Sequence, residues 1–69
     1  MTDERAHLAQ TDRHIARAKD HIRKQQQRVE RLAAKGHDVD DAENFLSLLT
    51  DILRTFERHR ILILDRKQS

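Results

Sequence analysis

Histidine is the residue type with the clearest chemical potential here, because it occupies five of the 69 positions. Neutral imidazole is a common ligand of transition metals. His7, His14 and His21 recur at intervals of seven. On one helix such neighbours lie about 10 Å apart along the axis, so no two of them can reach one ion at bond lengths of ~2 Å.

The remaining metal-binding signals are also weak. Only Asp3/His7 and His37/Asp41 have the i, i+4 spacing that lets two helical side chains meet, and each pair holds a single histidine. Cysteine is absent, which excludes disulfides and thiolate metal sites. The sequence therefore predicts no metal and no cofactor, and the three spaced histidines are interpreted as residues that flank a helical seam. The alternative is a metal site that uses His14 and His59, which pairing of the two helices would bring near each other.

Catalysis finds equally little support. Ser47 and Ser69 have no evident base partner, and the single glycine excludes a glycine-rich phosphate loop. A pair of helices also offers no preformed concave pocket. The sequence predicts a protein that is not an enzyme.

Basic residues give a candidate nucleic-acid face. Residues 13–35 contain eight basic and two acidic side chains, whereas residues 38–57 contain one basic and six acidic ones. A basic stripe can follow a phosphate backbone; its members would be Arg13, Arg17, Arg23, Lys24, Arg28 and Arg31. Asp20 and Glu30 interrupt the stripe, and no aromatic side chain accompanies it. The competing interpretation is a solvated face whose charge favours antiparallel pairing with the acidic segment.

The elements that position these residues follow from composition and from one turn signal. Charged residues make up 38% of the chain, and Pro, Trp and Tyr are absent, which favours long helices over strands. Gly36 suits the position after a helix end, and Asp38 suits a helix N-cap. We predict an all-α, antiparallel αα-hairpin in one domain (1–69), with helices at about 3–35 and 39–66 and a turn at about 36–38.

Both predicted helices carry a seven-residue repeat with apolar positions a and d. Position a holds Leu8, Ile15, Ile22 and Val29 in the first helix, and Ala42, Leu49, Phe56 and Ile63 in the second. Position d holds Thr11, Ala18, Gln25 and Leu32, then Phe45, Ile52 and His59. A hairpin folded about Gly36 and His37 predicts an a/d seam on both helices. It pairs Val29 with Phe45, Ile22 with Ile52, Ala18 with Phe56, Gln25 with Leu49, and Ile15 with His59. His59 is interpreted either as a buried, pH-sensitive imidazole or as a polar residue that sets register or lies at a hydrated end.

The two helices differ in apolar content, with five large hydrophobic residues in the first and twelve in the second. The apolar face of the first helix is too narrow to cover the wide apolar surface of the second helix. We therefore expect a homodimer that forms a four-helix bundle. The predicted interface consists of Leu46, Leu48, Leu53, Leu62, Phe56 and Ile63. Docking of the leucine-rich face onto another protein is the further alternative.

Membrane insertion is not expected, because no apolar run approaches the ~18 residues of a transmembrane helix. The first residues, MTDER, do not resemble a signal peptide. Ile61 to Leu64 form a short apolar run flanked by arginines, and we expect it at the end of a helical bundle. These features predict a cytoplasmic protein.

The segment from His14 to Leu64 resembles small two-helix proteins of soil and plant-associated proteobacteria. The resemblance lies in the heptad run from His14, the turn AKGHD at residues 34–38, and the leucine-rich second helix with FERHR at residues 56–60. It implies a cytosolic helical hairpin, without an activity or functional residues. The sequence thus predicts a non-catalytic, self-associating interaction or regulatory module, with nucleic-acid binding as the alternative.

Overall fold

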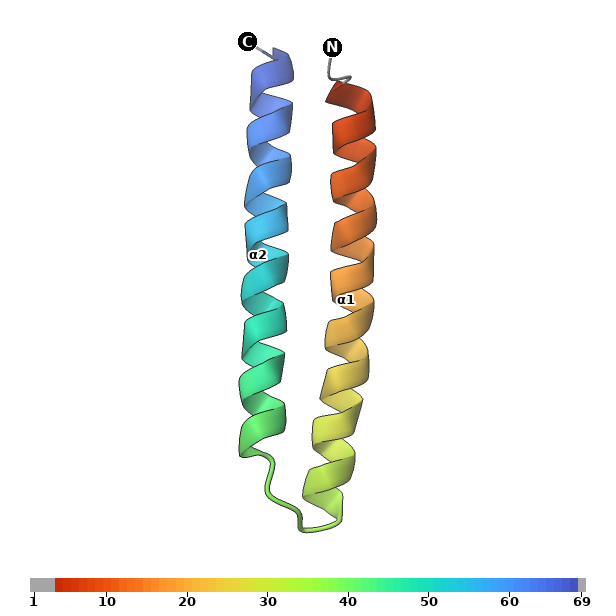
Figure 1. The fold of residues 1–69 in the computed structure, drawn as a ribbon, viewed down its shortest axis with the longest axis vertical. Coiled ribbons are helices and arrows are strands. Elements are labelled where there is room, and N and C mark those ends of the chain that lie inside the picture. Colours follow the sequence, from red (N-terminus) through yellow and green to blue (C-terminus); the bar gives the residue numbers. More distant parts are fainter. Residues whose placement is uncertain (1–3, 69) are drawn as a thin grey trace.

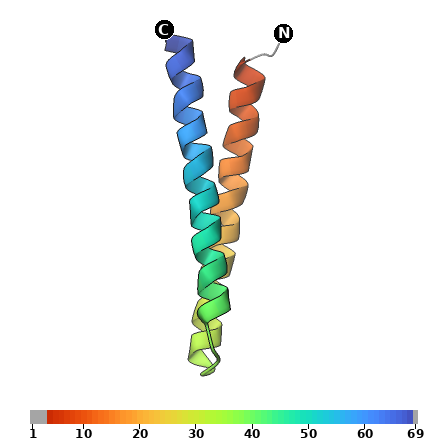
Figure 2. The same cartoon turned by 60° about the vertical axis from the view of Figure 1, so that its left-hand side comes forward.

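The computed structural model describes residues 4–68, which form two antiparallel α-helices, α1 (Glu4–Ala34) and α2 (Asp40–Gln68). The helices lie side by side along their whole length, and the two ends of the chain lie at the same end of the molecule (Figure 1). The hairpin measures 52 × 16 × 15 Å, and Figure 2 shows that the helices are inclined to one another. The predicted all-helical hairpin is confirmed, with bounds that differ by one or two residues.

The C-terminus of α1 is closed by a Schellman motif around Gly36. The backbone N–H of His37 donates to the carbonyl of Leu32 at 2.9 Å, and that of Gly36 donates to the carbonyl of Ala33 at 3.0 Å. Gly36 has φ 75°, a left-handed conformation that glycine adopts without steric cost. The predicted helix stop is therefore confirmed.

The N-terminus of α2 is capped by Asp38, as the sequence predicted. Its Oδ1 accepts a hydrogen bond from the backbone N–H of Asp40 at 2.9 Å, and the acidic first turn of α2 contains Asp40, Asp41 and Glu43. These negative charges oppose the positive end of the helix dipole. Local signals thus decide where both helices meet the turn.

The connection between the helices shifts their register. Residues 37–39 are non-helical and run back along the last turn of α1, so that α2 begins above the end of α1 (Figure 1). Three extended residues cover about 10 Å, against about 4.5 Å in a helix, and the difference is about one helical turn. The prediction assumed a symmetric turn and therefore missed this offset.

Contacts across the hairpin confirm the offset. Phe56 stacks on His14, one turn from its predicted partner Ala18, with ring centroids 5.1 Å apart. Gln25 donates from Nε2 to the carbonyl of Ala42 at 3.0 Å, two turns from its predicted neighbour Leu49. Both contacts show that α2 lies farther from the turn, measured along α1, than the predicted pairing of Gln25 with Leu49 and of Ala18 with Phe56 requires.

The prediction for the buried face of α2 is wrong in part. Positions a and d of α1 face the seam as expected, with Thr11 and Ala18 buried. In α2 the seam uses position a and position e, because Leu46 and Leu53 are half-buried whereas Phe45 and Ile52 are exposed. The helix is rotated so that its d column lies at the edge of the seam.

The resulting core is small. Ala18, Leu49 and Ile63 are the buried apolar residues, and no large side chain in the described part of the chain is fully buried. Thr11, which is 3% exposed, donates its hydroxyl to the carbonyl of His7 at 3.0 Å. The polar groups of this core are satisfied, but its apolar content is that of a marginal domain.

Candidate functional site

An exposed apolar column runs along α2, and we call it the α2 stripe: Phe45, Leu48, Ile52 and Leu62. Their exposed fractions are 49%, 54%, 39% and 54%. The four residues occupy positions d and g of the heptad, and Thr55 and His59 continue the column between Ile52 and Leu62. Alternating steps of three and four residues are the spacing by which one helix packs against another.

The α2 stripe lies to one side of the seam with α1. At 3.6 residues per turn, the d/g column lies about 100° around the helix from the a/e column. A helix in a four-helix bundle contacts two neighbours through faces about a quarter-turn apart. The α2 helix therefore has one covered contact face and one uncovered face at that angle.

The six residues predicted as the oligomer interface fall into three groups. Leu48 and Leu62 are exposed members of the α2 stripe. Leu46, Leu53 and Phe56 are half-buried within the hairpin, and Ile63 is 6% exposed. The sequence analysis placed the four leucines beyond the reach of α1 and placed Phe56 and Ile63 in the seam at position a. The rotation of α2, which it did not foresee, brings Leu46 and Leu53 into the seam as well.

Two members of the stripe were assigned to the wrong surface. Phe45 and Ile52 were expected inside the seam, opposite Val29 and Ile22, yet both are exposed. Phe45 borders a shallow groove with His21, Gln25 and Arg28 of α1. One edge of the stripe is therefore lined by polar side chains of α1, as is common at the rim of a protein interface.

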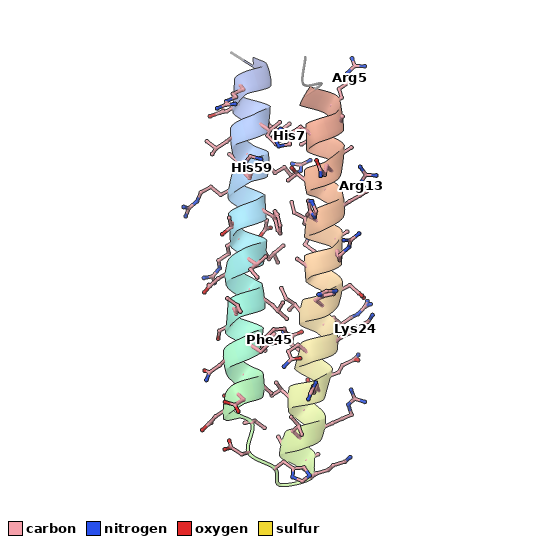
Figure 3. All side chains as sticks on the ribbon, in the orientation of Figure 1. Arg5, His7, Arg13, Lys24, Phe45 and His59 are labelled. Carbon is pink, nitrogen blue, oxygen red and sulfur yellow. The ribbon has the colours of Figure 1, made fainter. Side chains whose placement is uncertain are left out.

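The basic residues of α1 form a partly neutralised face. Asp20 forms ion pairs with Arg23 and with Lys24, the latter at 3.0 Å. Arg13 and Lys24 point away from α2 in Figure 3. All six residues of the candidate nucleic-acid face are exposed: Arg13, Arg17, Arg23, Lys24, Arg28 and Arg31. One carboxylate thus offsets the charge at the middle of this face.

The same ion pairs affect the acidity of Asp20. A hydrogen bond from Lys24 is the largest influence that lowers the pKa of Asp20 below its usual value of 3.8. The positive charges of Lys24 and Arg23 act in the same direction. The carboxylate is therefore held in its charged form, which maintains the interruption of the basic face.

The histidines are arranged differently from the prediction. His59 was predicted opposite Ile15, either buried or at a hydrated end of the seam. It is exposed, and its Nε2 lies 3.0 Å from Nε2 of His7. Figure 3 shows the two rings directed toward each other from α2 and α1. His14 instead stacks on Phe56, and Asp3, the helical neighbour of His7 in the sequence, lies outside the described residues.

The contact between His7 and His59 could not be predicted from their spacing in the sequence. His7 and His59 are 52 positions apart, and only the register of the hairpin brings them together. Within the described residues no group of three or more His, Cys, Asp or Glu side chains is arranged to hold a metal ion.

Neither described helix is long and apolar enough to cross a membrane.

Comparison with protein-family models, with curated proteins and with solved structures finds no match to this chain. The exposed surfaces of the hairpin are therefore the features that indicate its function.

Proposed function

We propose that the chain is a non-catalytic, self-associating interaction module, in which the α2 stripe packs against the same stripe of a second copy. The observation that carries this proposal is the uncovered d/g column, with Leu48 and Leu62 each 54% exposed. A second copy presents an identical column, so two-fold symmetry makes the contact self-complementary. The product would be a four-helix bundle.

The accessible surface of the single hairpin supports association. The chain exposes 5788 Å², whereas a compact monomer of 8.2 kDa exposes about 4,500 Å². The excess of about 1,300 Å² exceeds the ~800 Å² that each partner buries in an interface of standard size. One hairpin thus has enough surplus surface for one such interface.

Energetics point in the same direction. A fully buried Leu, Ile or Phe side chain gains ~1.5–3 kcal/mol relative to water. The four members of the α2 stripe are about half exposed, so covering them would gain roughly 3–6 kcal/mol per chain. This is comparable with the whole stability of a small domain, and it would compensate for the small core.

Sedimentation of the wild-type chain and of a Leu48→Glu/Leu62→Glu variant tests the proposal. We expect the wild type to sediment at about twice the 8.2 kDa chain mass and the variant as a monomer, because burial of two carboxylates without partners is costly. Ile61→Glu is the matched control: Ile61 is 62% exposed but occupies position f, outside the stripe. It should remain dimeric.

A wild-type chain that sediments as a folded monomer at micromolar concentration would contradict the proposal. The stripe would then be assigned to a different protein. Retention of DNA or RNA by that monomer at low salt, lost in an Arg17→Ala/Arg31→Ala variant, would instead support the nucleic-acid alternative.

A further inference from the structure

Two histidines meet across the open end of the hairpin, far from the turn. His7 lies in the second turn of α1 and His59 lies on α2 (Figure 3). Their Nε2 atoms are 3.0 Å apart, their ring centroids are 4.9 Å apart, and the ring planes are inclined by 59°. Both residues are exposed. We propose that His7 and His59 together form a binding site for a divalent transition-metal ion.

The separation of the two nitrogen atoms fits ligands of one ion. Two nitrogens bonded at ~2.0–2.1 Å lie about 2.9 Å apart at a right angle and about 3.4 Å apart at the tetrahedral angle. The observed 3.0 Å is between these values and near the first. Imidazole suits Zn²⁺, Ni²⁺ and Cu²⁺, and the right angle is typical of Ni²⁺ and Cu²⁺.

Without an ion, the same two atoms can share one proton. One ring then carries a hydrogen on Nε2, and the other ring accepts it through a lone pair. An ion requires a lone pair on both Nε2 atoms. The donating ring can provide it by moving its hydrogen to Nδ1, so that both imidazoles remain neutral and the ion replaces the shared proton.

Among the residues that the structure describes, His7 and His59 are the two ligands placed at this site. No group of three or more ligating side chains occurs among the described residues. On the C-terminal side of His7, the first carboxylate of α1 is that of Asp12, which already accepts a hydrogen bond from Nε of Arg60 at 2.7 Å. Water must therefore complete the coordination, as in open metal sites, and the ion is expected to exchange readily with solvent.

Binding would connect the two helices where the hairpin is open. In the unfolded chain, 52 positions separate the two histidines, so the site exists only when α1 and α2 are paired. A ligand that binds the folded state alone raises its stability. The ion would thus act as a clamp on the hairpin.

Thermal unfolding with and without NiCl₂ or ZnCl₂ tests the site. We expect both salts to raise the Tm of the wild type, and titration calorimetry to give one ion per chain. His7→Gln and His59→Gln should each abolish the rise while leaving the metal-free fold intact, since both residues are exposed. His14→Gln and His37→Gln are matched controls that should retain it.

Copper provides a second readout. The electron paramagnetic resonance spectrum of the Cu²⁺-loaded chain should show two nitrogen ligands in the wild type and one in either His variant. A Tm that millimolar metal leaves unchanged, or a rise that persists in His7→Gln or His59→Gln, would overturn the proposal. One ion per two chains would also overturn it, because the ion would then lie between copies.

Discussion

At the scale of single residues, Gly36 is the position where backbone conformation matters most. Its φ of 75° is unfavourable for residues with a β-carbon, and no heavy atom lies within 4 Å of where that carbon would be. The cost of substitution is therefore conformational and not steric. We expect Gly36→Val to lower the free energy of unfolding by about 1–2 kcal/mol or more, as measured by urea denaturation.

Gly36→Asn is the control for this position, because asparagine tolerates the left-handed region better than valine. Its loss of stability should be smaller. Equal unfolding curves for wild type and Gly36→Val would show that the Schellman motif does not terminate α1 in solution.

Asp20 gives a pH dependence of known sign. Because Lys24 and Arg23 lower its folded-state pKa below 3.8, the charged carboxylate stabilises the folded chain above the unfolded pKa. This contribution is lost as the pH falls through the folded pKa. Asp20→Asn should therefore flatten the dependence of Tm on pH between about 5 and 2.

Glu30→Gln is the matched control, since Glu30 is an exposed acid of the same helix for which the structure shows no ion pair. Glu30→Gln should change the dependence of Tm on pH between about 5 and 2 less than Asp20→Asn does. NMR titration of the Asp20 carboxyl provides an independent measurement, and a midpoint at or above 3.8 would contradict the assignment.

At the scale of the elements, the start of α2 depends on Asp38. Its carboxylate accepts the backbone N–H of Asp40, which otherwise has no partner within the helix. We expect Asp38→Ala to cost about 0.5–2 kcal/mol and Asp38→Asn to cost much less. Circular dichroism during chemical denaturation measures both, and an Ala variant as stable as the Asn variant would argue against capping.

At the scale of the whole molecule, stability and assembly should be coupled. The hairpin has only three buried apolar residues among those described, and the proposed partner copy would supply the missing burial. The Tm of the wild type should therefore rise with protein concentration. The dependence should vanish in Leu48→Glu/Leu62→Glu and persist in Ile61→Glu; a wild-type Tm independent of concentration would contradict self-association.

The sequence by itself determined the helices and the turn between them, because their signals are local. Gly36 ends α1 and Asp38 caps α2 through hydrogen bonds with backbone groups a few residues away. The heptad repeat identifies which face of α1 packs against α2. The bounds of α1 and α2 could accordingly be predicted to within two residues. The expected dimer stays a prediction, since it concerns a second chain.

Only the tertiary structure decided which face of α2 meets α1. The d and e columns have nearly equal apolar content, with Phe45 and Ile52 against Leu46 and Leu53, so periodicity could not distinguish them. The connection at residues 37–39 shifts α2 by about a turn along α1, and a rotation of α2 about its own axis places the e column in the seam. The rotation leaves the α2 stripe exposed, and the shift brings His59 to His7, because long-range contacts depend on register and register depends on the path of the connection.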